Sequence, residues 1–183
     1  SYEYERQRMY DQAANNYLSI SVLDENTNRA DNDLGTVVEG KPYTNMEHKW
    51  DEAFGYLFGG SQDRAKPLDD LGAGDSFLNK YLGRLEADED YAGIAAATEL
   101  AFRTGRAAIV AGDYEERDRQ ATIIKDNLTK ILAVRAVYYL KQGEIALTTA
   151  PANVGGAFHD LGEDYGFSYS LRFVNGQDPT TVD

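Results

Sequence analysis

The chain has 183 residues, of which 42% are hydrophobic, and this length and composition suit one domain with a real core. Its formal net charge of −13 excludes nucleic acid as a partner, because phosphate binding needs a basic face, and it disfavours adsorption to anionic lipid. The absence of cysteine excludes disulfides, thiolate zinc sites and cysteine nucleophiles, so any metal must be held by histidine, carboxylate or carbonyl groups.

The first predicted element is a helix over Glu3 to Leu18, where Met9, Ala13 and Tyr17 recur at helical spacing. The polar stretch from Asp24 to Gly40, rich in Asn, Asp and Gly, is predicted to be a loop. The chain has no initiator methionine and begins inside a helical pattern. We therefore expect residues 1–183 to form a single domain that is a fragment of a longer chain.

The next helix has a clear start signal. Thr44 is a favoured N-cap, and Glu47 three residues later completes a capping box, which predicts a helix from Asn45 to about Phe58. Gly59-Gly60 ends it, and a loop follows over residues 61–75.

Two further helices are predicted between residues 76 and 111. Ser76 is placed to cap a short helix through Leu85, and Asp90 to cap a helix from Tyr91 to about Ala111. No strand pattern competes with these helices. The small residues near the start of the second helix would allow close packing against a neighbour.

The strongest helical pattern runs from Tyr114 to about Thr148, with a wide apolar stripe along one side. Pro151 is placed to start a last helix that runs to about Phe173. No apolar run approaches the ~20 residues of a membrane span, so no transmembrane segment is predicted in this chain. Together the elements predict an all-α helical bundle.

The only two histidines occur in the same local pattern. His48 is followed by Glu52 and His159 by Glu163, in each case four residues later, and an aromatic, a glycine and a second aromatic then follow at matched offsets. On a helix, residues four apart share one face. We expect the two helices to be adjacent, so that two imidazoles and two carboxylates face a common interior.

Such a set is typical of a metal site in a helical bundle. Asp51 and Asp160 lie beside the two pairs and would add oxygen ligands or orient an imidazole. Nitrogen and carboxylate ligands suit iron, zinc or manganese better than copper(I). The predicted metal ligands are His48, Asp51, Glu52, His159 and Glu163.

Other interpretations compete with the metal site. Both histidines would equally suit satisfied polar positions near helix ends, with the two glutamates as surface carboxylates. The tyrosines and other aromatics around the two motifs suit core packing or a carbohydrate platform. No zinc-protease His-Glu-x-x-His, nucleophile elbow or phosphate-binding loop is present, so no catalytic residue or organic cofactor is predicted.

Two segments resemble the signatures of a group of bacterial envelope proteins related to imelysin. They are Tyr43-Thr44-Asn45-Met46-Glu47-His48-Lys49-Trp50-Asp51-Glu52-Ala53-Phe54-Gly55-Tyr56, and Gly155-Gly156-Ala157-Phe158-His159 through Ser168-Tyr169-Ser170-Leu171-Arg172-Phe173. The resemblance implies an all-helical fold built from two related bundles, which accords with the internal repeat. It also implies export, as a periplasmic protein or as a lipoprotein of the outer membrane or cell surface.

The family's namesake is described as a peptidase, and relatives are tied to iron uptake or polysaccharide binding. The family's metal-associated His-x-x-Glu pattern falls here on His48 and Asp51, and on His159 and Gly162, with Glu163 one place later. Because Gly162 is no ligand, the pattern departs from a faithful metallopeptidase site.

The resulting hypothesis is an exported, imelysin-like helical protein that binds a metal ion, iron before zinc, through the duplicated His/Glu motif. A metal-dependent peptidase, and a carbohydrate-binding or structural surface protein, stay open as alternatives. The expected partners are the metal ion and, under those alternatives, polysaccharide or other envelope proteins.

Overall fold

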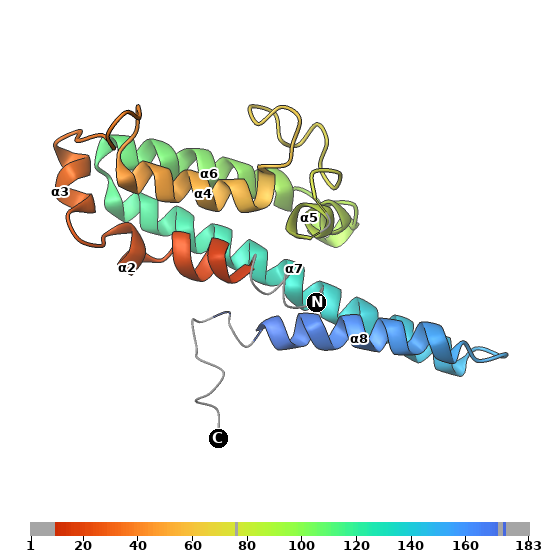
Figure 1. The fold of residues 1–183 in the computed structure, drawn as a ribbon. Helices are drawn as coiled ribbons and strands as arrows, with labels where there is room; N and C mark the ends of the chain where they lie inside the picture. Colours follow the sequence, from red (N-terminus) through yellow and green to blue (C-terminus); the bar gives the residue numbers. More distant parts are fainter. Residues whose placement is uncertain (1–9, 76, 172–173, 175–183) are drawn as a thin grey trace, which may run out of the picture.

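The computed structural model describes residues 10–75, 77–171 and 174, and every regular element within these ranges is a helix (Figure 1). The predicted all-α class is therefore confirmed. In chain order the elements are η1 (Asp11–Tyr17, a π-helix), α2 (Ile20–Leu23), α3 (Asn28–Asp33), α4 (Asn45–Phe58), α5 (Leu78–Glu86), η2 (Glu89–Tyr91, a 3₁₀ turn), α6 (Ile94–Ala111), α7 (Tyr114–Thr148) and α8 (Val154–Ser170).

Helix α7 is the spine of the described structure (Figure 1). Its 35 residues give a length of roughly 50 Å at 1.5 Å per residue. Helix α6 precedes it in a helical hairpin and packs along its first half, while α8 folds back along its second half. The elements before α6 pack mainly beside the α6–α7 hairpin, so α8 extends away from them.

The main core lies where α4 and η1 meet α6 and α7. Trp50 is 1% exposed, and its indole Nε1 donates to the Phe102 carbonyl oxygen over 2.9 Å, which satisfies the only polar atom of this side chain. Gly105 on α6 leaves the space that the Trp50 ring fills. The indole thus fixes the spacing of α4 and α6.

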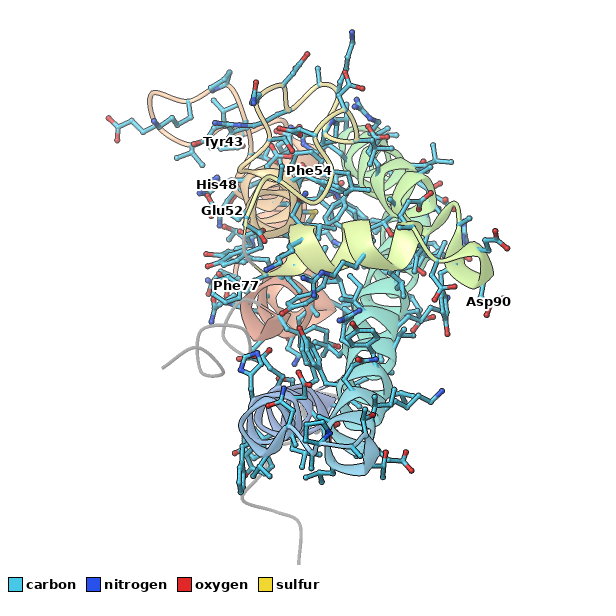
Figure 2. All side chains as sticks on the ribbon, turned by 90° about the vertical axis from the view of Figure 1, so that its right-hand side faces the viewer. Tyr43, His48, Glu52, Phe54, Phe77 and Asp90 are labelled. Atoms are coloured by element: carbon cyan, nitrogen blue, oxygen red, sulfur yellow. The ribbon has the colours of Figure 1, made fainter. Side chains whose placement is uncertain are left out.

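Helix α5 crosses the middle of α7 and connects the core to α8 (Figure 2). The Tyr81 ring contacts the Phe167 ring edge-on, with centroids 5.0 Å apart, and Phe167 in turn stacks on Tyr139 at 5.8 Å. Aromatic pairs of this kind contribute about 0.5–1.5 kcal/mol beyond their buried area. This cluster positions one end of a groove between α5 and α7.

The predicted bounds of α4 and α7 were confirmed, and so was the capping box predicted for α4. Thr44 Oγ1 accepts from the Glu47 backbone N–H, and Glu47 Oε2 accepts from the Thr44 N–H, which is the predicted capping box. At α7, Asp113 accepts from the Glu116 N–H. Both helices have the predicted bounds.

Three predicted boundaries were wrong. Residues 24–40 contain the short helix α3, whose Asn32 amide donates to the Ile109 carbonyl oxygen of α6, so a distant contact stabilises it. Helix α6 begins at Ile94 because Gly93 has φ +93°, a left-handed conformation that interrupts the chain after η2. Helix α8 begins after Asn153, whose side chain accepts from the Gly156 N–H, and not at Pro151.

Some predictions lie outside the described residues: the helix over residues 3–9, the cap at Ser76 and the helix end at Phe173. Across the part of the chain that is described, no helix has the length and apolar character needed to cross a bilayer.

Candidate functional site

The first predicted metal pair lies on the surface of α4. His48 Nε2 is 3.7 Å from Glu52 Oε1, and the two side chains are 43% and 44% exposed. The His48 ring stacks on Tyr43, with centroids 5.1 Å apart and planes 14° apart, and Figure 2 shows the three residues along one side of the molecule. The helical register therefore places this His and Glu on one face, as predicted.

Asp51 has a different role from the predicted one. Its Oδ1 accepts from Arg106 Nε over 3.1 Å, and Arg106 Nη1 also donates to Glu47 over 2.7 Å. Burial raises the pKa of Asp51, and the Arg106 charge offsets part of that increase. Asp51 thus joins α4 to α6 in an ion-pair cluster.

The second predicted pair lies on another part of the molecule. His159 is exposed on α8, one turn before Glu163, and α8 packs on the second half of α7 whereas α4 packs on η1 and α6 (Figure 1). Within the described ranges, no three His, Asp or Glu side chains are grouped closely enough to hold a metal ion. The structure therefore does not bring the two pairs together, and the expected common interior has no counterpart in this arrangement.

A groove between α5, η2 and α7 has a different chemistry. Its volume is about 460 Å³, within the range of small-molecule sites. Figure 2 shows α5 crossing in front of α7, from Phe77 before its start to Asp90 beyond its end. Arg135, Tyr138 and Lys141 of α7 line the groove together with Asp90.

Arg135 is the most unusual side chain in this groove. It is 7% exposed, yet its Nε and Nη2 atoms are buried without a hydrogen-bond partner. Three tyrosine rings surround its guanidinium, with Cζ 3.9 Å from the Tyr138 centroid, 4.9 Å from Tyr139 and 5.4 Å from Tyr81. Cation–π contacts of desolvated cations contribute about 2 kcal/mol or more, but they leave both N–H donors unmatched.

The two unmatched nitrogens belong to one edge of the guanidinium. The Nε and Nη2 donors point in parallel, and this fork matches the two oxygens of a carboxylate or phosphate. The other buried arginine of α7, Arg117, differs because it pairs with Asp24 over 2.6 Å and with Asp118 over 2.8 Å. Arg135 has no carboxylate partner among the described residues.

A second cation and a tyrosine hydroxyl lie beside Arg135. Arg84 Nη1 donates to the Tyr139 hydroxyl over 3.3 Å. Burial alone would raise the pKa of Tyr139, but hydrogen bonds with Tyr81, Arg135 and Arg84 and the charge of Arg135 together lower it. The polar end of the groove therefore favours negative charge, in a chain that is strongly acidic elsewhere.

The lining of the groove also carries negative charge. Asp88 and Asp90 line it at the η2 turn, where Asp88 Oδ1 accepts from the Asp90 N–H over 3.1 Å. No ion pair between described residues joins either carboxylate to Arg84, Arg135 or Lys141. Charges of both signs thus line one groove and stay separate.

A second groove, of about 430 Å³, lies between α4 and α6. Trp50, Phe54 and Phe102 form its apolar floor, and three arginines line it as well: Arg64, Arg103 and Arg106. Arg106 is already paired with Glu47 and Asp51, and Arg103 with Glu99. Two of the three arginines are therefore neutralised within the protein, and none of the three has a buried N–H group without a hydrogen-bond partner, so this groove favours a ligand less than the α5–α7 groove does.

The sequence itself indicated that Arg135 is unusual, although no motif includes this residue. Arg135 stands four residues after Ile131 and four before Tyr139, both buried, so it occupies a core position of the apolar stripe. A charged residue at such a position needs a partner. Only the fold shows that its surroundings are aromatic rings and not carboxylates.

The chain is an all-helical domain with a groove of about 460 Å³ along its central helix. A family described as a domain of unknown function, DUF4856, matches residues 7–181, and the chain belongs to this family. No curated protein and no solved structure matches the chain significantly. The family match carries no link to imelysin, so that resemblance stays a prediction.

Proposed function

We propose that this domain is a binding module that holds a small anionic ligand in the α5–α7 groove. The observation that carries the proposal is the buried edge of Arg135, with Nε and Nη2 unmatched. A charged donor left unpaired in the protein interior costs several kcal/mol in real proteins. A ligand oxyanion that accepted a hydrogen bond from each of these two N–H groups would offset that cost. The free energy gained in this way would favour binding.

The surroundings of Arg135 support an anion over other ligands. Arg84 and Lys141 add positive charge to the same groove, and Arg84 also holds the Tyr139 hydroxyl in place. The aromatic rings lower the local dielectric constant, so a charge-assisted hydrogen bond formed there is stronger than one at the open surface.

The test uses thermal denaturation and isothermal titration with acetate, inorganic phosphate and N-acetyl-leucine as probes. The best probe should raise the melting temperature, by an amount equivalent to about 2.7 kcal/mol at one hundred times its dissociation constant. Arg135→Gln should lose that increase, because glutamine provides no parallel fork. Arg103→Gln on α6, the same change outside this groove, should retain it. Equal stabilisation of both variants would show diffuse anion binding and overturn the proposal.

A second candidate is metal binding at His48 and Glu52, supported by their 3.7 Å separation on the exposed face of α4. This second candidate includes two further expectations that the resemblance supports. They are an imelysin-like bundle with an internal repeat and a location in the bacterial envelope. Two ligands from one helix turn would bind iron or zinc weakly, with water or a partner completing the coordination.

Calorimetric titration of the metal-free protein with iron, zinc and manganese tests this second candidate. His48→Ala should abolish uptake at this pair, whereas His159→Ala should leave it unchanged, because α8 is remote from α4. Equal uptake by both variants would show diffuse attraction to the acidic surface. Hydrolysis of peptides by the metal-loaded protein would be required for the peptidase alternative, and binding of polysaccharide without metal for the carbohydrate alternative.

A further inference from the structure

The α5–α7 groove is lined both by cations and by two carboxylates that do not pair with them, and this arrangement restricts the class of ligand. We infer that the ligand is a small zwitterion, an amino acid or short peptide whose free carboxylate and free ammonium are joined by an apolar body. The inference rests on the proposed function, because it takes Arg135 as the carboxylate receptor.

The two carboxylates in the groove lining favour a ligand that carries an ammonium. Asp88 and Asp90 are exposed on η2 and do not pair with the cations of α7. The hydrogen bond from the Asp90 N–H to Asp88 Oδ1 holds the Asp88 carboxylate at the η2 turn. A ligand with negative charge alone, such as inorganic phosphate, would gain from Arg135 but be repelled by the two carboxylates. A ligand that also carries an ammonium would interact favourably with the cations and with the two carboxylates.

Apolar residues in the groove lining favour a ligand whose two charged groups are joined by an apolar body. Leu85 is buried and Val134 half-buried on facing helices, and Val137 is 51% exposed beside them. Burial of an aliphatic side chain against such a surface contributes about 25 cal/mol per Å² of apolar area. The volume of about 460 Å³ accommodates one residue or a dipeptide.

Tyr138 controls access to the carboxylate receptor. Its ring lies over the Arg135 guanidinium and is itself 43% exposed, so it forms part of the cover between this guanidinium and solvent. Entry of the carboxylate requires this ring to turn aside. Exposed side chains change rotamer within nanoseconds, so the movement is compatible with rapid binding.

The experiment compares four related probes on the full chain by isothermal titration. Leucine and leucyl-leucine carry both charges, N-acetyl-leucine lacks the ammonium, and leucinamide lacks the carboxylate. We expect one of the two zwitterions to bind at least about tenfold more tightly than N-acetyl-leucine, a difference of about 1.4 kcal/mol. Leucinamide should not bind measurably.

Three variants test which residues bind the carboxylate of the ligand and which bind its ammonium. The double change Asp88→Asn and Asp90→Asn should remove the advantage of the zwitterion, while asparagine at position 88 keeps the side-chain cap of η2. Glu89→Gln is the matched control, because it removes one charge from the same turn at a residue outside the groove lining. Arg135→Gln should remove binding of the zwitterion and of N-acetyl-leucine.

The outcomes separate the inference from the proposed function. If N-acetyl-leucine binds as tightly as the zwitterions, and the binding depends on Arg135, the groove is an anion site. The inference of a zwitterionic ligand is then wrong. If neither leucine nor leucyl-leucine binds, the inference is also wrong, and the acetate, phosphate and N-acetyl-leucine titrations then decide the proposed function by themselves. A loss of the zwitterion's advantage in Glu89→Gln would show a general effect of charge.

Discussion

The Arg135 guanidinium carbon lies 3.9 Å from the centroid of the Tyr138 ring, and this tyrosine covers a cation that has no carboxylate partner among the described residues. The adjacent tyrosines at positions 81 and 139 complete the enclosure. The rings attract the charge of Arg135, but their faces do not accept the N–H bonds of its Nε and Nη2 atoms, which stay unmatched.

The Tyr138 ring that covers Arg135 should slow the chemical modification of this arginine. In Tyr138→Ala, phenylglyoxal should modify Arg135 at least about tenfold faster than in the wild type, because removal of the ring exposes a side chain that is otherwise buried. Tyr138→Phe should keep the protection. Peptide mapping by mass spectrometry measures the rates, with the half-exposed Arg103 as internal reference. Equal protection of Arg135 in the alanine variant would show that other groups shield it.

The two buried arginines of α7 should differ in their effect on stability. Arg117→Met should lower the free energy of unfolding by about 3–5 kcal/mol, because it removes the partner of Asp24 and Asp118. Arg135→Met should leave it unchanged or raise it by about 1 kcal/mol in the ligand-free protein, because an unpaired buried charge is replaced by an apolar group of similar length.

Urea denaturation of both variants provides the comparison, with the slope checked for constancy. Similar large losses in the two variants would mean that the cation–π contacts of Arg135 outweigh its desolvation, and that the site does not need an anionic ligand.

Tyr139 should titrate before Tyr10 and Tyr114, two other buried tyrosines. Its pKa is lowered below the usual value of about 10, whereas burial raises the pKa of Tyr10 and Tyr114. A lowered pKa in the folded state means that ionised Tyr139 stabilises the fold. This contribution is full above the unfolded pKa of about 10 and is lost as the pH falls through the folded value.

Absorbance at 295 nm, followed from pH 7 upward, tests this order of titration. Tyr139→Phe should lose the earliest tyrosinate, and its stability deficit relative to wild type should grow as the pH rises toward 10 and above. An unchanged early phase in Tyr139→Phe would assign the lowest pKa to another tyrosine.

Two glycines in neighbouring helices should respond oppositely to alanine. In Gly105→Ala on α6, the added Cβ would overlap the Trp50 ring, so we expect a loss of about 1–3 kcal/mol from overpacking. Gly55→Ala on α4 meets no atom within 4 Å, so it should gain about 0.5–1 kcal/mol from helix propensity. Thermal and urea denaturation measure both changes, and a loss in Gly55→Ala would mean that this exposed face packs against something.

Local chemistry determined the elements that could be predicted from the sequence. Thr44 and Glu47 complete a capping box within four residues, so the start of α4 depends on no distant contact. The apolar stripe between Tyr114 and Thr148 likewise defines one long helix by its own periodicity. The shared face of His48 and Glu52 follows from helical geometry alone.

Tertiary packing decided everything that joins distant residues. The matched offsets around His48 and His159 could not show that α8 packs on the far half of α7, away from α4. Asn32 forms part of a helix because it contacts Ile109 across the fold. The same holds for Arg135, because a charged residue in an apolar stripe shows only that a partner is needed. The packing of α5 and α7 determines that aromatic rings surround its guanidinium and that its parallel donors stay unmatched, since these neighbours are set by interhelical contacts that no local pattern encodes.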